Sequence, residues 1–315
     1  GPMYVIKNGL PKRMLPLAYF FALAGMIGCL PAFQSNQLIQ ITGDLAFSEI
    51  ENFNIFGGLV LAGITGIVVI GGLKRIAEVA TFLVPLMGSI YFGAMIVALI
   101  LNLNLVLPAF KLIFFDAFNG TAIAGGTFFG VLIYGVRRGA FSNEAGMGTE
   151  SLVHGVAKVS NPVKQGLVAM TGPIFDTLII CTATALMILV SGVWETSSSQ
   201  GVTLTAEAFS ILLGSFGGFI LFTCVICFGL STIFTYSYYG ASCSRFLFGK
   251  FGMKFYIYLY ILSIFIYSIV PIDIAINIAD GAFAMMAIPT LISALWLAPK
   301  VMQASRNYFK LIDNN

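Results

Sequence analysis

Two polar pairs lie inside stretches that are otherwise apolar, and their side chains are of kinds that can hold a cation. Ser231 and Thr232 are neighbours, and hydroxyl oxygens together with freed backbone carbonyls are the ligands that a dehydrated sodium ion needs. Asp176 is followed by Thr177, and no basic residue stands at a matching depth in another apolar stretch. A carboxylate in that position is expected to pair, to take a proton or to bind a cation. Each pair also has a structural alternative, because hydroxyls in apolar helices commonly bond a carbonyl of the preceding turn and Asp176 could bond hydroxyls and backbone groups.

Two amide side chains form a third candidate site, suited to a polar solute. Gln34 and Asn36 follow Pro31 within another apolar stretch. Residues two apart do not share a helix face, so at least one of these amides is expected to face the interior of a helix bundle. The amides could contact a polar substrate, or they could hydrogen-bond between helices near the membrane surface.

The sequence lacks the residue sets that are typical of enzymes. His154 is the single histidine, and no nucleophile elbow, phosphate-binding loop or zinc-protease motif is present. Cys224 and Cys227 have a C-x-x-C spacing, but without a second pair we interpret them as small buried residues rather than as zinc ligands. We therefore expect a protein that is not an enzyme and that carries no cofactor.

The composition indicates where these polar residues lie. Of 315 residues, 58% are hydrophobic and only 9% are charged, whereas a soluble domain carries about a quarter charged residues. So little charge cannot cover a water-facing surface of this size, and we predict an all-α integral membrane protein. A spanning helix needs about 20 mostly apolar residues. Eight stretches qualify, at 14–38, 54–73, 78–101, 118–136, 167–193, 208–236, 255–272 and 274–298.

The basic residues support this map of spans. Cytoplasmic loops of membrane proteins carry an excess of Lys and Arg. If the N-terminal arm is cytoplasmic, all of the 16 Lys and Arg residues except Lys111 fall on the inner side. A wrong number of spans would scramble this asymmetry. The sequence thus predicts a multi-pass protein of the plasma membrane, with both ends in the cytoplasm and no basic cluster for nucleic acid.

The fourth stretch contains closely spaced glycines. Gly125 and Gly126 are adjacent, and Thr127, Phe128 and Phe129 follow. Glycine in a membrane helix permits close packing of helices, or it permits local unwinding that frees backbone groups to bind a substrate. The residues alone favour packing, while the adjacent pair in a short span leaves unwinding open.

Several strings resemble conserved motifs of the alanine or glycine:cation symporter family. The longest, YGVRRGAFSNEAGMG at 134–148, matches the family pattern Y-G-x-x-R-G-x-F-S-N-E-A-G-x-G almost throughout. The other strings are GPMY at 1–4 with KNGL at 7–10, QSN at 34–36, DT at 176–177 with CT at 181–182, FGLST at 228–232 with SYYG at 237–240, and MAIP at 286–289. Together they cover essentially the whole chain.

The resemblance implies a leucine-transporter-like fold, in which two inverted five-helix repeats hold substrate and sodium near the middle of the membrane. It implies secondary active uptake of alanine or glycine, coupled to Na⁺ or possibly H⁺, by alternating access in a bacterial inner membrane. A passive channel or a non-transporting scaffold is the alternative. The residues to which the resemblance gives roles fall into three sets. They are the sodium ligands Ser231 and Thr232, the substrate contacts Gln34, Asn36, Gly125, Gly126, Thr127, Phe128 and Phe129, and the further functional residues Asn143, Glu144, Asp176 and Thr177.

Some positions depart from the family pattern. Leu30-Pro31 stands where the family usually has G-N, and Phe129 replaces a small residue of G-G-F-A-G, so the choice between alanine and glycine is not predicted. The chain opens without an initiator methionine and lacks the first two core helices of the family, so we expect an N-terminally truncated carrier whose eight spans are core helices three to ten. On this interpretation 1–117 is the remainder of the first repeat, 118–299 is the second repeat and 300–315 is a frayed cytoplasmic tail.

Overall fold

The computed structural model describes residues 1–118 and 128–313, and every regular element within those ranges is a helix. Five helical stretches, some of them made of several elements, are long and apolar enough to cross a membrane, which confirms the expected all-helical membrane architecture. They are Lys12–Ala46, Gly72–Leu101, Pro162–Ser191, Ser215–Ile269 and Ile272–Ile312. Two shorter apolar helices are α4 (Phe53–Val69) and α13 (Val202–Leu213).

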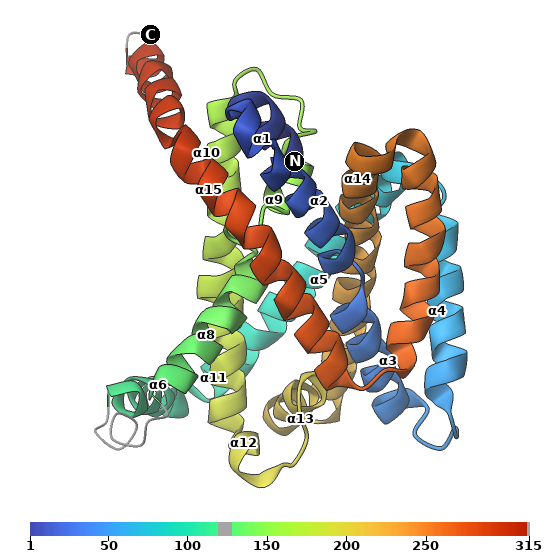
Figure 1. Cartoon of the computed structure of the whole chain (residues 1–315). Helices are drawn as coiled ribbons and strands as arrows, with labels where there is room; N and C mark the ends of the chain where they lie inside the picture. Colours follow the sequence, from blue (N-terminus) through green and yellow to red (C-terminus); the bar gives the residue numbers. More distant parts are fainter. Residues whose placement is uncertain (119–127, 314–315) are drawn as a thin grey trace.

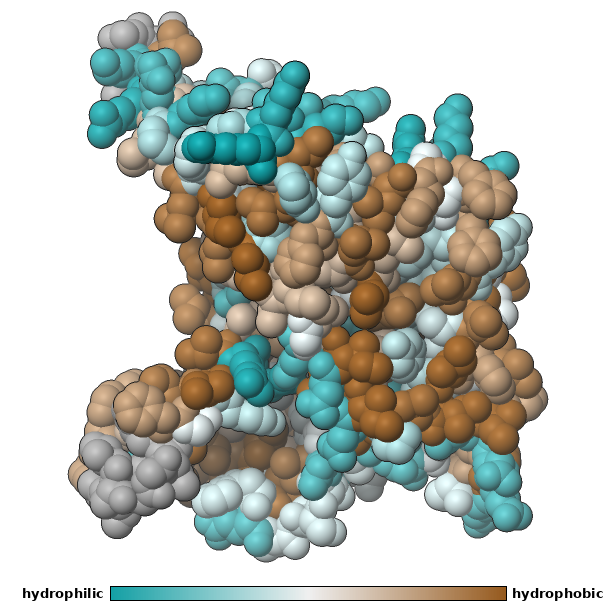
Figure 2. Space-filling model, in the orientation of Figure 1, coloured by the Kyte–Doolittle hydropathy of each residue, from teal (hydrophilic) through white to brown (hydrophobic). Residues whose placement is uncertain are grey.

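The surface has the polarity that a bilayer requires. Figure 2 shows hydrophilic side chains gathered at the two ends of the molecule and a broad hydrophobic surface between them. Large apolar side chains such as Phe56, Phe82 and Leu295 are well exposed on this surface. In water such a surface would associate or aggregate, whereas hydrocarbon tails cover it at no cost.

The predicted first span is two helices rather than one. Helix α1 (Pro2–Gly9) and a short turn of 3₁₀ helix (Lys12–Met14) lead into α2 (Leu15–Gly28). The chain breaks before Pro31 and resumes as α3 (Ala32–Ala46). Proline lacks an N–H and disfavours helical geometry in the residue before it, so the break falls where the sequence places Pro31.

The predicted sixth and seventh spans are the two limbs of α14 (Ser215–Ile269), which has a kink at Gly249 with φ 68° and ψ −155°. Figure 1 shows the chain turning back at the top of α14, so that its second limb runs beside α4. A start for the sixth span at residue 208 was wrong, because Gly214 with φ 71° separates α13 from α14. Both breaks use glycine at a positive φ that other residues avoid.

The remaining spans agree with the map less closely at their ends. Helix α5 (Gly72–Leu101) carries the third span, and α10 (Pro162–Pro173), the π-helical segment η2 (Ile174–Cys181) and α11 (Thr182–Ser191) form the fifth. Helix α15 (Ile272–Asp313) carries the eighth and continues through the tail. The expectation of a frayed tail was therefore wrong, since α15 continues without a break through Asp313.

The connections are also largely helical. Helix α6 (Leu103–Phe118) occupies what we expected to be an outer connection, and α8 (Phe128–Asn143) carries the described part of the fourth span and extends beyond residue 136. Two short helices, α9 (Glu150–His154) and α12 (Val193–Thr196), complete the described part of the chain.

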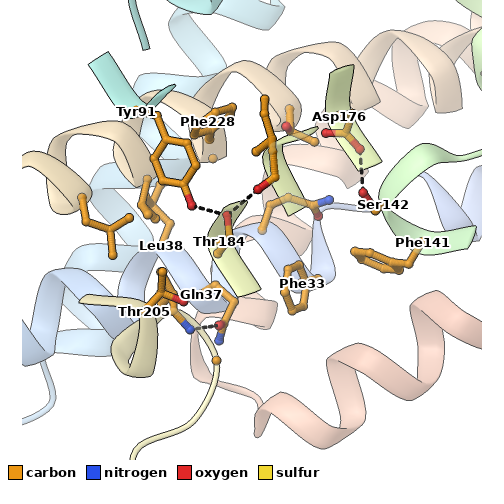
Figure 3. A pocket seen from close by; sticks show the side chains of 18 of the residues that line it. Phe33, Gln37, Leu38, Tyr91, Phe141, Ser142, Asp176, Thr184, Thr205 and Phe228 are labelled. Atoms are coloured by element: carbon orange, nitrogen blue, oxygen red, sulfur yellow. Dashed lines mark hydrogen bonds between the residues drawn. The ribbon is translucent and has the colours of Figure 1, made fainter. Parts of the chain in front are cut away.

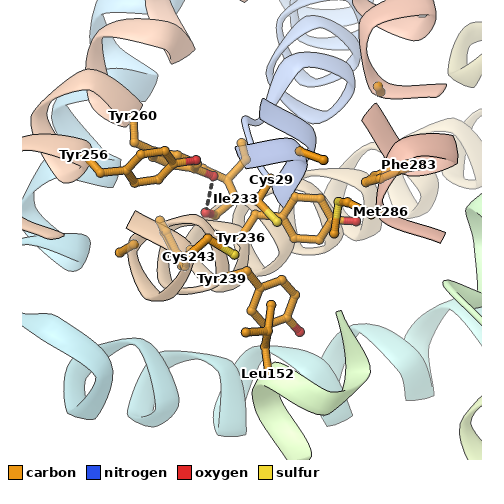
Figure 4. Packing of buried hydrophobic residues seen from close by; sticks show 14 of the residues in the cluster. Cys29, Leu152, Ile233, Tyr236, Tyr239, Cys243, Tyr256, Tyr260, Phe283 and Met286 are labelled. Atoms are coloured by element: carbon orange, nitrogen blue, oxygen red, sulfur yellow. Dashed lines mark hydrogen bonds between the residues drawn. The ribbon is translucent and has the colours of Figure 1, made fainter. Parts of the chain in front are cut away.

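Small residues and buried tyrosines hold the helices together. A Cβ built on Gly25 of α2 would lie 2.8 Å from Cys243 Sγ of α14, so only glycine permits this approach. Two buried tyrosines of the second limb of α14 hydrogen-bond to other helical segments. Tyr256 donates to the carbonyl of Met26 at 2.8 Å. Tyr260 donates to the carbonyl of Ile233 at 2.6 Å (Figure 4). Because lipid offers no hydrophobic drive for helix association, such close packing and hydrogen bonding stabilise the bundle.

Candidate functional site

A cavity of about 480 Å³ opens between α3, α5, α8, η2, α13 and α14 (Figure 3). Its apolar wall includes Phe33, Leu38, Tyr91, Phe141 and Phe228. Its polar side chains are Gln34, Gln37, Ser142, Glu144, Asp176, Thr184, Thr205, Thr232 and Tyr236. Two of these are carboxylates, and no Lys, Arg or His belongs to the described lining. The cavity therefore suits a small polar solute that carries or accompanies positive charge.

The two predicted amides separate into different roles. Gln34 lines the cavity. Asn36 points to the end of α14, where its Nδ2 donates to the carbonyls of Tyr267, at 3.2 Å, and Val270, at 2.7 Å. These carbonyls lie at the C-terminal end of α14, where backbone carbonyls have no hydrogen-bond donor within the helix. Asn36 thus closes a helix end, and the cavity holds only Gln34 of the predicted pair.

Gln37 is a cavity residue to which we assigned no role from the sequence, although it belongs to the same polar run as Gln34 and Asn36. Its Oε1 accepts a hydrogen bond from the backbone N–H of Val202, at 3.3 Å, and its Nε2 donates to Gln40, at 2.8 Å. A residue three positions after Gln34 lies on the same helix face, so the spacing could have identified it. The Val202 bond ties α3 to the start of α13 at the rim of the cavity.

Asp176 lies on the π-helical segment η2 and meets α8 through Ser142. The Ser142 hydroxyl donates to Asp176 Oδ2 at 2.6 Å, and Thr177 Oγ1 lies 3.4 Å from the same oxygen. Wide π-helical turns inside α-helices occur frequently at functional sites. Ser142, from the long motif at 134–148, thus lies beside the adjacent residues Asp176 and Thr177.

The motif residues Asn143 and Glu144 end α8 and turn the chain. Asn143 Oδ1 accepts the N–H of Ala145 at 2.9 Å, so Asn143 serves the turn. Glu144 has φ 53°, which is uncommon and strained for a residue other than glycine. Its side chain reaches the cavity, where the Tyr236 hydroxyl donates to Oε1. Glu144 lies in the loop between α8 and α9, and burial raises the pKa of its carboxyl.

The hydroxyl pair on α14 is only partly directed at the cavity. Thr232 belongs to its lining. Ser231 Oγ donates to the carbonyl of Phe228 at 2.9 Å and is buried. Ser231 therefore makes the local backbone hydrogen bond that is the structural alternative to ion binding. Thr232, in contrast, is accessible to a solute in the cavity.

The predicted glycine site is described only at its edge. Gly125, Gly126 and Thr127 lie outside the described residues, and Phe128 begins α8. The Phe129 side chain is 70% exposed and is not part of the cavity lining.

An ion pair that sequence reasoning missed joins α8 to α15. Arg138 Nη2 lies 2.5 Å from Asp280 Oδ2, and the guanidinium also lies over the ring of Phe141. Phe141 lines both the first cavity and a second one of about 410 Å³ beside Asp280. Its ring contacts Phe33 and Phe283, with centroids 5.3 and 5.5 Å away, so an aromatic cluster stands between the two cavities.

Comparison with known proteins places these features in a family context. The model of the sodium:alanine symporter family matches residues 1–315. An uncharacterized transporter of Bacillus subtilis, YflA, is 36% identical over 98% of this chain and 66% of its own length. The sodium/alanine symporter AgcS of Methanococcus maripaludis is 34% identical over 100% of this chain and 70% of its own. The probable sodium/glutamine symporter GlnT of Bacillus subtilis is 32% identical over 98% and 64%. The chain thus spans about two thirds of the length of these relatives.

Proposed function

Because this chain belongs to the sodium:alanine symporter family, a family of sodium-coupled amino-acid transporters rather than enzymes, we propose that it takes up a small neutral amino acid together with Na⁺. The observation that carries the proposal is the cavity with two carboxylates, two amides and no basic side chain in its described lining. An intramembrane cavity with these groups is expected to have a transport role.

The chemistry of the cavity fits the two ends of an amino acid. The carboxylate of Glu144 attracts the ammonium group, and Asp176 adds a second negative charge to the cavity. The amides of Gln34 and Gln37 offer donors to the carboxylate group. The apolar wall receives a small neutral side chain. Relatives are named for alanine and for glutamine, so we propose alanine or glycine as the first substrates to examine and glutamine as their main competitor.

Sodium is a co-substrate in this proposal. Thr232 on the cavity wall supplies a hydroxyl ligand, and Ser231 could supply a second by rotating away from the Phe228 carbonyl. We further propose alternating access between the two repeats of a leucine-transporter-like fold in a plasma membrane, with 118–299 as the second repeat. The repeat boundaries stay predictions.

Uptake into proteoliposomes tests the proposal. The protein, expressed from its complete reading frame, should accumulate labelled alanine or glycine when an inward Na⁺ gradient is present, and uptake should saturate. Collapse of the gradient with a sodium ionophore should abolish accumulation. Flux that does not saturate and does not depend on Na⁺ would identify a channel. A protein that is folded but gives no flux would favour the non-transporting scaffold.

A further inference from the structure

Three oxygen atoms from two helical segments converge where α8 meets η2. Ser142 Oγ lies 2.6 Å from Asp176 Oδ2 and 3.3 Å from Thr177 Oγ1, and Thr177 Oγ1 lies 3.4 Å from Asp176 Oδ2. Ser142 and Asp176 belong to the lining of the 480 Å³ cavity, and Figure 3 shows the bond between them. Two of the three residues are thus reachable by a small solute, and Thr177 lies directly beside them.

We propose that Ser142, Asp176 and Thr177 bind a sodium ion, at a site separate from the hydroxyl pair Ser231–Thr232 on α14. The inference rests on the proposed function, because it assigns a place to a coupling ion of the same carrier. The two sets of ligands come from different helices. The carrier would then have two places for a cation at its cavity.

The spacing of the oxygens fits a hard cation of sodium's size. Such ions take oxygen ligands at about 2.3–2.6 Å, so neighbouring ligands around one ion stand about 3.0–3.7 Å apart. Two of the three separations already lie in that range. The third separation, between Ser142 Oγ and Asp176 Oδ2, is shorter because the Ser142 hydroxyl donates a hydrogen bond to the carboxylate. Rotation of that hydroxyl would turn a lone pair toward an ion in its place.

The surrounding charges favour a cation over an anion or a neutral ligand at this site. Asp176 has an exposed carboxylate in a stretch that crosses the membrane, where an unpaired charge is costly. The cation on the facing helix, Arg138, is paired with Asp280 instead. Glu144 adds a second negative charge to the same cavity. No basic side chain of the described lining balances the charge of Asp176, and a bound cation would do so.

The backbone at this point is also suited to supply ligands. Residues Ile174–Cys181 are wound as a π-helix within an otherwise α-helical span. A change of winding alters which carbonyls have helical partners, and such segments are frequent at functional sites. Carbonyls of η2 can therefore complete a shell that the three side chains begin.

Equilibrium binding of ²²Na⁺ to the purified protein, expressed from its complete reading frame and without amino acid, tests the site directly. The variants are Asp176→Asn, which removes the charge at constant shape, and Ser142→Ala and Thr177→Val, which each remove one hydroxyl. The matched control is Thr171→Val on the same span, because Thr171 bonds the Val168 carbonyl at 2.7 Å and lies outside the cavity lining. We expect the half-saturating Na⁺ concentration of this site to rise at least tenfold in Asp176→Asn and about threefold or more in each hydroxyl variant, with no change in the control.

The outcomes separate this inference from the proposed function. If Asp176→Asn leaves Na⁺ binding intact and weakens alanine binding, Asp176 pairs with the ammonium group and the inference is overturned while the carrier proposal stands. Absence of Na⁺ binding by the wild-type protein would overturn both. If Asp176→Asn does not fold, Ser142→Ala and Thr177→Val decide, and unchanged Na⁺ affinity in both would reject the site.

Discussion

The hydroxyl of Tyr236 on α14 donates a hydrogen bond to the carboxylate of Glu144 in the loop after α8. These residues are 92 positions apart, yet both belong to the cavity lining. The bond holds the side chain of a residue whose backbone has a positive φ. Burial raises the pKa of its carboxyl. The hydrogen bond thereby fixes the loop between α8 and α9 against α14.

Tyr236→Phe should destabilise the protein through this bond. When a buried carboxylate loses its hydrogen-bond donor, the free energy of unfolding falls by about 1–3 kcal/mol. The pKa of Glu144 should also rise further, because the hydrogen bond stabilises the charged form. The midpoint of thermal unfolding in detergent should fall accordingly. A double-mutant cycle with Glu144→Gln is the control, since the two losses should not add. Additive effects would show that the bond contributes nothing to stability.

Gln34→Ala and Asn36→Ala should have opposite signatures although the residues are two positions apart. Gln34 lines the cavity, so its loss should raise the half-saturating alanine concentration about tenfold, which corresponds to about 1.4 kcal/mol, with little effect on stability. Asn36 bonds two carbonyls at the end of α14, so its loss should cost about 1–3 kcal/mol of stability and leave alanine affinity unchanged. Uptake kinetics and thermal unfolding of both variants check this. A loss of alanine affinity in Asn36→Ala alone would contradict the assignment.

Much of the membrane architecture was predictable because long apolar stretches have few alternatives to a spanning helix. The break at Pro31 has a visible cause. The break at Gly249 falls in the expected connection between the sixth and seventh spans. The break at Gly214 was missed, since a glycine shows its positive φ only in the structure and many glycines of this chain lie within helices. The helical tail was missed because polar composition says little about whether the end of a chain is ordered.

The candidate site was predictable by residue type but not by partner. Asp176 and Thr232 attracted attention as polar groups in apolar stretches, and both lie at the cavity. Ser142 and Tyr236 were given no role, because a hydroxyl on a helix is ordinary until its neighbour is known. Asn36 resembled Gln34 in the sequence, and only the position of the α14 carbonyls separates their roles.

Replacement of the hydroxyl pair on α14 should weaken sodium coupling. Ser231→Ala with Thr232→Ala should raise the Na⁺ concentration for half-maximal uptake at least about tenfold, since two lost ligands cost more than about 1.4 kcal/mol. Thr232→Ala alone should account for most of the change, because Thr232 lines the cavity and Ser231 bonds Phe228. Thr223→Ala is the matched control, as its hydroxyl bonds its own helix at 3.0 Å. Unchanged sodium dependence in the double variant would leave only the local bonding role.

The topology predicts which loops a membrane-impermeant thiol reagent can reach. The connections α3–α4 and α12–α13 lie at one end of the molecule, and the connection α9–α10 lies at the other (Figure 1). With the five native cysteines replaced and uptake retained, a cysteine at Glu51 or Ser198 should label on intact cells. One at Lys158 should label only after permeabilisation, because basic loops face the cytoplasm. Labelling of position 158 from outside would reverse the orientation, and labelling of 51 and 198 from opposite sides would show that the number of spans between them is wrong.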